Sequence, residues 1–325
     1  MGQVYLARDL KLHRVVAVKA LSRTFAILPE ASSSFLREAQ LGARLEHAGI
    51  VSIYAFGEHD GIPFLVMQFL GGGTLADRIR SELLPDEVVA PLLADLADAL
   101  GFAHRQGVVH RDVKPENVLF SDPESTARPM IADFGVATRP THDAGPGQRR
   151  LGYGTPHFMS PEQSQGDLNL DGRSDLFSLG VLGYLLLTGT YPYDGPSEPS
   201  IAAARIRGAR TPLHLAAPHA PPRLVAAVER CLAPDPANRW QSAEEFARAV
   251  RSSVVVSSPG GPSRRTGSRR SGPMMQPPST HRRTLTDLIS SVPAAVRRSV
   301  RSLGGIPLMA RRASRIDPLQ SLRIE

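Results

Sequence analysis

The first part of the chain contains four short apolar runs separated by polar turns. Residues 3–9 and 14–21 are rich in Val, Leu and Ala, with a polar turn between them. The runs 50–56 and 62–69 flank a second turn that contains Gly61. Short apolar runs on either side of such a turn are typical of β-hairpins. We therefore predict two hairpins in one antiparallel sheet.

One helical pattern lies between the two predicted hairpins. Residues 35–41 read Phe-Leu-Arg-Glu-Ala-Gln-Leu, which places apolar side chains at helical spacing. The serines at 32–34 precede this pattern, and serine is a favoured N-cap residue. We predict a single main helix beside the sheet, with its N-cap among these serines.

From residue 84 onward the pattern is mainly helical. A helix is predicted over 84–106, ending at Gly107, because apolar residues recur at positions 89, 92, 93, 96, 100 and 103. Pro91 is tolerated only near the first turn, so this helix should begin close to Pro91 or be kinked there.

A second helix is predicted over 174–188, ending at Gly189. It is apolar nearly all round, so it must be buried. The remaining patterns predict three further helices and two short strands, over 200–208, 222–233, 242–251, 118–120 and 130–132. The pattern therefore predicts an α+β protein with a sheet followed by an α-rich part.

The amino-acid composition changes after residue 252, and the chain becomes rich in Ser, Pro, Gly and Arg. The formal net charge is +7, yet residues 257–325 hold thirteen Arg, no Lys and three acidic residues. The basic charge therefore belongs to the tail. We place a domain boundary near 252 and treat 253–325 as a largely disordered tail, with a linker at 257–283 and a possible basic helix at 284–303.

Candidate chemistry is concentrated in residues 110–117, which read His-Arg-Asp-Val-Lys-Pro-Glu-Asn. Asp112 could accept a proton from an attacking hydroxyl, Lys114 could neutralise a phosphoryl group, and Asn117 could hold magnesium. The alternative is a polar surface turn. Lys19 and Lys114 are two of only three lysines among 38 basic residues, which favours a functional role for both.

Residues 110–117 resemble the catalytic loop of eukaryotic-type (Hanks-type) protein kinases, in the bacterial Ser/Thr group. Tyrosine kinases usually lack the lysine at the position of Lys114. Three more motifs agree in order: Val-Ala-Val-Lys at 16–19, Asp-Phe-Gly at 133–135, and Ser-Pro-Glu at 160–162. The resemblance implies a bilobal protein-kinase fold over 1–252, with an N-lobe at about 1–70 and a C-lobe at about 71–252.

The resemblance also implies ATP and Mg²⁺ as cofactors. Lys19 would reach the α- and β-phosphates of ATP and pair with Glu38, while Asn117 and Asp133 would bind the metal. The residues that would contact the nucleotide are Gly2, Val4, Ala17, Lys19, Met67, Phe69, Leu119 and Asp133. Met67 would be the gatekeeper, at the start of a hinge over 67–70, and the glycines at 71–73 would provide a flexible exit.

Further roles follow from the resemblance in the C-terminal part. Asp175 would anchor the catalytic loop, Arg239 would pair with Glu162, and the Thr155 hydroxyl would bridge Asp112 and Lys114. Arg111 suggests control by a phosphate on the loop. However, residues 142–152 contain no Ser or Thr.

The sequence departs from the family at its beginning. Of the Gly-rich phosphate loop only Gly2 and Val4 remain, so we expect an N-terminal truncation within that loop. This departure leaves open a catalytically impaired pseudokinase that acts as a signalling scaffold. The favoured interpretation is a kinase that transfers the ATP γ-phosphoryl group to Ser or Thr hydroxyls of proteins.

Other classes of function are weaker. The Arg-rich tail lacks interleaved aromatic residues or a nucleic-acid-binding module, so no nucleic-acid partner is expected. No run reaches the roughly 18 apolar residues of a membrane helix. A membrane is not required, although the tail could bind acidic lipid. Cys231 stands alone and should be buried, which suggests a reducing, cytoplasmic location. Substrate identity and oligomeric state stay open.

Overall fold

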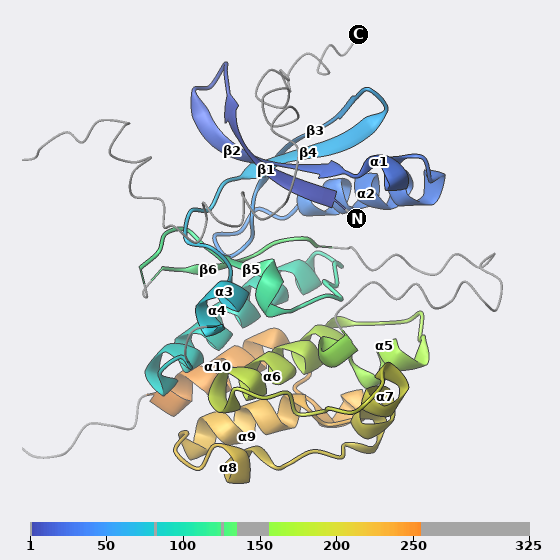
Figure 1. Ribbon diagram of the computed structural model, residues 1–325. Coiled ribbons are helices and arrows are strands. Elements are labelled where there is room, and N and C mark those ends of the chain that lie inside the picture. Colours follow the sequence, from blue (N-terminus) through green and yellow to red (C-terminus); the bar gives the residue numbers. More distant parts are fainter. Residues whose placement is uncertain (1, 81–82, 125–126, 135–155, 255–325) are drawn as a thin grey trace, which may run out of the picture. The chain divides into compact units, whose positions relative to one another are not determined.

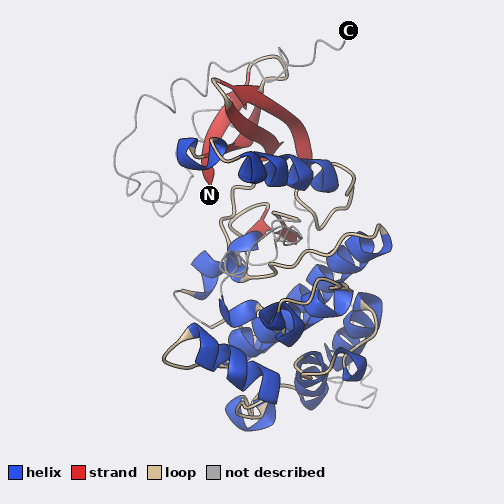
Figure 2. Ribbon diagram, turned by 90° about the vertical axis from the view of Figure 1, so that its right-hand side faces the viewer, coloured by secondary structure: helices blue, strands red, loops and turns tan. Residues whose placement is uncertain are grey.

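The computed structural model describes residues 2–80, 83–124, 127–134 and 156–254. The predicted tail with its linker and basic helix, and Gly135 and Thr155 of the motifs, lie outside these residues. In the described part, most strands lie together in one sheet and helices make up most of the remainder (Figure 2). The α+β class predicted from the pattern is confirmed.

The four-stranded sheet is antiparallel throughout and has the order β1-β2-β4-β3 (Figure 1). Its strands are β1 Gly2–Asp9, β2 Arg14–Leu21, β3 Ile53–His59 and β4 Ile62–Gln68. Both predicted hairpins are therefore confirmed. The strand β3 begins later than predicted because Ile50 instead forms a parallel bridge with Ile131.

Two helices lie beside this sheet, α1 Arg23–Ala26 and α2 Pro29–Gly42. Phe35 and Ala39 of α2 pack against Leu21 and Leu65 of the sheet. The predicted serine N-cap is wrong. The N-cap residue is Leu28, without a side-chain hydrogen bond, because a proline at the first helical position already has a helical φ angle.

The α-rich part contains eight helices among the described residues. They are α3 Leu75–Ile79, α4 Asp86–Arg105, α5 Pro161–Gln165, α6 Gly172–Thr188, α7 Glu198–Arg207, α8 Leu213–Ala216, α9 Pro222–Cys231 and α10 Ala243–Val254. A two-stranded antiparallel sheet joins β5 Val118–Phe120 to β6 Pro129–Ile131. The short helices α1, α3, α5 and α8 were not predicted, since four or five residues are too few to show a helical period.

The helix α6 is the centre of this part. Every residue from Ser174 to Leu187 is buried, as its apolar pattern predicted, and the helix ends at Gly189 in a left-handed conformation. Cys231 on α9 is also fully buried, and burial raises the pKa of its thiol. Among the described helices, none has both the length and the apolar character needed to cross a membrane.

Pro91 lies in the second turn of α4, five residues after the helix begins. The helix therefore starts earlier than the position of Pro91 predicted. Proline has no N–H, so one backbone carbonyl of the preceding turn lacks its helical donor. The side chain of Pro91 is exposed, so this carbonyl can be solvated. Gly107 follows the C-cap residue and has a φ angle of 72°, which confirms the predicted end of the helix.

The glycines at 71–73, predicted to be a flexible exit from the hinge, are instead tied to the strand β5. Gly71 N–H donates to Ser121 O at 3.2 Å, Gly72 N–H donates to Phe120 O at 3.0 Å, and Phe120 N–H donates to Gly73 O at 3.1 Å. A Cβ atom on Gly72 would lie 2.0 Å from Asp122 O. Gly72 has no room for a side chain because two backbones approach closely there.

We predict that Gly72→Ala lowers the melting temperature markedly, because the new methyl group meets backbone atoms that cannot rotate away. Overpacking of this kind costs roughly 1–3 kcal/mol or more, which is several degrees for a chain of this size. The matched control is Gly71→Ala, whose Cβ would meet no atom closer than 3.8 Å. Equal melting temperatures for the two variants, measured by calorimetry, would contradict the close approach.

Candidate active site

Lys19 stands between two carboxylates that come from different elements. Its Nζ lies 2.7 Å from Glu38 Oε1 on α2 and 2.9 Å from Asp133 Oδ1, just after β6. The predicted Lys19–Glu38 pair is therefore present in the structure. The side chain of Asp133 is 30% exposed, whereas those of Lys19 and Glu38 are only 13% and 8% exposed.

The charges in this trio influence one another. Burial opposes the charge of Lys19, but Asp133 and Glu38 outweigh it, and the pKa of Lys19 is raised. Burial raises the pKa of Glu38 to about 7; Lys19 works against this rise and Asp133 adds to it. One ammonium group thus serves two carboxylates, and the more deeply buried one holds its proton more tightly than an ordinary glutamate.

The catalytic-loop candidates converge on one oxygen. Lys114 Nζ lies 2.7 Å from Asp112 Oδ2, and Asn117 Nδ2 donates to the same oxygen at 3.1 Å. Asn117 Nδ2 also donates to the backbone O of Asp112 at 2.8 Å. The three side chains predicted to act together are therefore in direct contact.

A buried carboxylate on α6 holds the beginning of this loop. Asp175 Oδ2 accepts from His110 N–H at 2.8 Å, and Oδ1 accepts from Arg111 N–H at 2.7 Å. Arg111 has a φ angle of 70°, a left-handed conformation that is unfavourable for a residue with a side chain. The predicted anchoring role of Asp175 agrees with this geometry.

His110 connects the catalytic loop to the Asp133 segment. Its Nε2 lies 2.9 Å from Ala132 O, and Asp112 N–H donates to its Nδ1 at 3.2 Å. The ring therefore carries its proton on Nε2. It also packs edge-on against Phe134, with ring centroids 4.6 Å apart. In addition, Ala132 N–H donates to Asn117 O at 2.9 Å. The two candidate metal ligands are thus on neighbouring, hydrogen-bonded backbones.

Some of the residues predicted to contact the nucleotide lie close together in the structure. Ala17 faces Met67 across the β2–β4 pair, and Val4 faces Lys19 across the β1–β2 pair. Met67 and Leu119 pack against one apolar cluster of Val51, Leu70, Met130 and Ala132. Val4 is 60% exposed and Phe69 is 36% exposed, and Gly2 is also exposed. Their contact with a nucleotide stays a prediction.

The predicted pair of Arg239 and Glu162 is present, with the Arg239 side chain fully buried and that of Glu162 13% exposed. Arg239 donates to both carboxylate oxygens of Glu162, at 2.7 and 2.8 Å, and Ser174 Oγ donates to Glu162 Oε1 at 2.6 Å. Burial alone would raise the pKa of Glu162, but the hydrogen bonds from Arg239 and Ser174 lower it. This pair fixes the start of α5 to the segment before α10.

A magnesium ion fits the donor atoms at this site. Because the amide nitrogen of Asn117 bonds Asp112, its carbonyl oxygen is the atom left for a cation. Asp133 uses Oδ1 for Lys19, which leaves Oδ2. Magnesium prefers oxygen ligands and commonly takes only one or two from the protein. Within the described ranges no group of three His, Cys, Asp or Glu side chains could hold a metal by itself.

Two residues at this site were not predicted. His104 on α4 has its Nε2 2.8 Å from Asp175 Oδ2, and Gln163 Nε2 donates to Arg111 O at 2.8 Å. Both act on the catalytic loop from outside its sequence motif. No local pattern marks either one, because each contact joins segments at least 50 residues apart.

Comparison with known proteins identifies the family. The model of the protein kinase domain matches residues 1–250. Serine/threonine-protein kinase PknB of Mycobacterium tuberculosis is 40% identical over 256 residues, which are 76% of this chain and 40% of that protein. Serine/threonine-protein kinase pkn2 of Myxococcus xanthus is 38% identical over 254 residues, or 77% of this chain and 30% of that protein.

A solved structure agrees with these relatives. The crystal structure of the Mycobacterium tuberculosis PknI kinase domain is 30% identical, with a TM-score of 0.60, and the match covers 78% of this chain and 91% of that one. The chain therefore belongs to the protein kinase family, and the predicted bilobal kinase fold is confirmed. It spans about two fifths of the length of the PknB proteins it matches. The boundary near residue 252 stays a prediction.

We predict a pH-dependent effect of Glu38→Gln on stability. Because the folded-state pKa of Glu38 is raised from 4.5 to about 7, the folded chain binds this proton more tightly than the unfolded chain. The stability that Glu38 contributes is complete below pH 4.5 and is lost as the pH rises through 7. The variant should therefore gain stability relative to the parent over this range, by on the order of 3 kcal/mol at most.

The measurement is the difference in unfolding free energy between parent and variant at several pH values from 4.5 to 8. The matched control is Glu30→Gln, on the exposed face of the same helix. A difference that does not change with pH for Glu38→Gln would contradict the raised pKa.

Proposed function

We propose that this chain is an ATP-dependent serine/threonine protein kinase. The observation that carries the proposal is the convergence of Lys114 Nζ and Asn117 Nδ2 on a single oxygen of Asp112. This arrangement gives one carboxylate that can accept a proton, beside one amine that can neutralise a phosphoryl group. Family membership and the names of the relatives support the same activity.

The residues around Asp112 would carry the transfer step. Asp112 would accept the proton of a substrate hydroxyl while the oxygen forms its bond to the γ-phosphorus and the bond from that phosphorus to the ADP oxygen breaks. Lys114 would stabilise the charge on the moving group. Lys114 and Asn117 already orient Asp112, so little rearrangement of this carboxylate is needed.

The residues around Lys19 would position the nucleotide. Lys19 would bind the α- and β-phosphates, oriented by Glu38, and Gly2 would lie in the loop that covers the phosphates. The residues that would contact the adenine are Val4, Ala17, Met67, Phe69 and Leu119. Magnesium, when bound by Asn117 and Asp133, would neutralise charge on the phosphates. Because the Lys19–Glu38 pair is already formed, these side chains are ready to receive a nucleotide.

The substrates proposed are Ser and Thr hydroxyls of proteins. The presence of Lys114 supports this choice, since the equivalent lysine is usually missing from tyrosine kinases. The scaffold alternative rests on the departure within the Gly-rich loop. Against it, Lys19, Glu38, Asp112, Asn117 and Asp133 are all present, and each of them makes the contact described above.

We predict that Asp112→Asn abolishes phosphoryl transfer while ATP binding persists. The amide preserves the shape of the side chain but cannot accept the proton, which should cost at least about a hundredfold in kcat. Lys19→Met should lower transfer as well, by releasing the phosphates. The assay follows labelled phosphate from ATP into a protein substrate, and phosphoamino-acid analysis should find phosphoserine or phosphothreonine.

The control for Asp112→Asn is Asp167→Asn, at an exposed position whose carboxylate accepts a hydrogen bond from the backbone amide of Asn169. This variant should transfer phosphate at the parent rate. Transfer by Asp112→Asn at the parent rate would remove Asp112 from the reaction. A parent chain that binds ATP but transfers nothing would favour the scaffold alternative.

A further inference from the structure

The Arg-rich segment 257–325 contains five pairs of adjacent arginines. A Ser or Thr directly follows four of these pairs, and a Ser follows the fifth pair after one Ala. Because 16 of the 69 residues in this segment are Ser or Thr, chance would place one directly after roughly one pair in four. The hydroxyls that follow the pairs belong to Thr266, Ser271, Thr284, Ser299 and Ser314. The pattern therefore joins a repeated basic signal to a repeated acceptor for phosphate.

We propose that this chain phosphorylates its own segment 257–325 at the hydroxyls that follow the arginine pairs. This inference rests on the proposed kinase activity and names a substrate for it. The hydroxyl oxygen of each acceptor would bond to the γ-phosphorus of ATP, its proton would pass to Asp112, and the bond from that phosphorus to the ADP oxygen would break. The composition of the segment predicts disorder, and a disordered segment exposes its hydroxyls to an enzyme.

A carboxylate suited to an arginine lies beside the proposed transfer residues. Glu116 stands between Lys114 and Asn117, on the short 3₁₀-helix Pro115–Asn117, and it is exposed. Lys114 and Asn117 both contact Asp112. Glu116, by contrast, has no hydrogen bond or ion pair within the part of the chain that the structure describes. Its carboxylate is therefore available to a cationic side chain of a substrate.

Two aromatic rings add to this position. The Tyr191 ring stacks on that of His157, with centroids 4.1 Å apart and planes 14° apart, and Tyr191 is 37% exposed. Burial raises the pKa of Tyr191, and the charge of Glu116 adds to the rise, so the carboxylate lies near this ring. Arginine binds carboxylates through its planar fork and stacks on aromatic faces. These groups together favour an arginine next to the acceptor hydroxyl.

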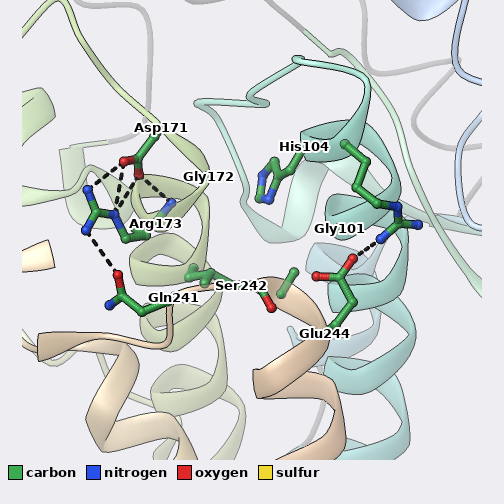
Figure 3. Close-up of a pocket in the computed structure, with 11 residues that line it drawn as sticks. Gly101, His104, Asp171, Gly172, Arg173, Gln241, Ser242 and Glu244 are labelled. Carbon is green, nitrogen blue, oxygen red and sulfur yellow. Dashed lines mark hydrogen bonds and ion pairs between the residues drawn. The ribbon is translucent and has the colours of Figure 1, made fainter. Parts of the chain in front are cut away.

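The cavity in Figure 3 is a second place with acidic side chains. It measures about 450 Å³ and lies where α4 ends and where α6 and α10 begin. Its two carboxylates are already paired, Asp171 with Arg173 and Glu244 with Arg105. An arginine from a substrate would have to displace one of these partners. None of the residues proposed for transfer lines the cavity, so Glu116 accounts better for the arginine pairs.

Phosphate at the five hydroxyls would remove most of the basic charge of the segment. Residues 257–325 hold thirteen Arg and three acidic residues, which give a formal charge of +10. Each phosphate adds about −1.5 to −2 at neutral pH, so five of them would lower this charge to about +2 or less. Self-phosphorylation would thus convert a strongly basic segment into a nearly neutral one.

The first test maps phosphate on the full chain. The chain is treated with a phosphatase, freed of it and incubated with ATP and Mg²⁺, and the modified residues are identified by mass spectrometry over time. We expect the five hydroxyls that follow arginine pairs to be modified faster than Ser290 and Ser291, which follow Leu288 and Ile289. The full chain should then elute from a cation exchanger at lower salt. Asp112→Asn should show neither change.

A second test isolates one arginine pair. The peptide 293–301 contains a single hydroxyl, that of Ser299, directly after Arg297 and Arg298. Its match is the same peptide with both of these arginines replaced by alanine. We expect the parent chain to phosphorylate the arginine peptide with a kcat/KM roughly tenfold higher, because complementary charges speed association.

The carboxylate is tested through the ratio of these two kcat/KM values. Glu116→Gln should bring the ratio close to one, since the amide carries no charge for the arginines. Glu58→Gln removes an exposed carboxylate on β3 and should keep the ratio of the parent. An unchanged ratio in Glu116→Gln would overturn the role of Glu116.

Equal kcat/KM values for the two peptides would overturn the proposal, as would modification of Ser290 and Ser291 as fast as that of the five hydroxyls. Phosphate on the segment in Asp112→Asn would also overturn it, because another kinase would then be responsible. Casein is added as an independent protein substrate. Labelling of casein without the segment 257–325 would overturn this inference and leave the proposed function standing. A parent that labels neither would defeat the proposed function, and this inference with it.

Discussion

The buried carboxylate of Asp175 is the constraint on which the candidate active site depends. It lies on α6, whose residues from Ser174 to Leu187 are all buried, so its position is set by the core. Burial alone would raise its pKa, but hydrogen bonds from His104 and from the Arg111 amide lower it. The carboxylate therefore stays charged, and its two oxygens hold the backbone just before Asp112. The candidate catalytic loop is in this way fixed to α6, the buried helix at the centre of the α-rich part.

The four-stranded sheet contributes one ammonium group, that of Lys19, to the candidate site. Lys19 on β2 contacts Glu38 on α2 and Asp133 after β6, so three separate segments meet at a single side chain. Burial raises the pKa of Glu38, the Asp133 carboxylate adds to the rise, and the single ammonium of Lys19 does not cancel it, so Glu38 binds its proton tightly. The arrangement costs stability and keeps Lys19 close to a second acceptor. A divalent cation would offset this excess of negative charge, which would favour binding of a nucleotide together with its cation.

Much of the fold could be predicted because its signals are local. The two hairpins alternate apolar runs with turns, and α6 is apolar on every side. The pairs of Lys19 with Glu38 and of Arg239 with Glu162 could be predicted only through the resemblance to kinases, since nothing local joins them. His104, Gln163 and the pairing of 71–73 with β5 were missed, because each depends on segments that meet only in the folded chain. The N-cap of α2 was predicted wrongly because the helix begins at Pro29, before the serines that the prediction used as N-cap candidates.

The anchoring role of Asp175 can be tested directly by comparing Asp175→Asn with Asp9→Asn. Asp9 is a second buried carboxylate that accepts two backbone amides, those of Lys11 and Leu12, but it lies at the β1–β2 turn. The measurement is kcat for phosphoryl transfer, with ATP affinity and melting temperature determined on the same samples. We expect Asp175→Asn to lose at least about a hundredfold in kcat while it still binds ATP, because the loop loses its charged acceptor. Asp9→Asn should lose stability without losing kcat. A parent-like kcat in Asp175→Asn would contradict the account.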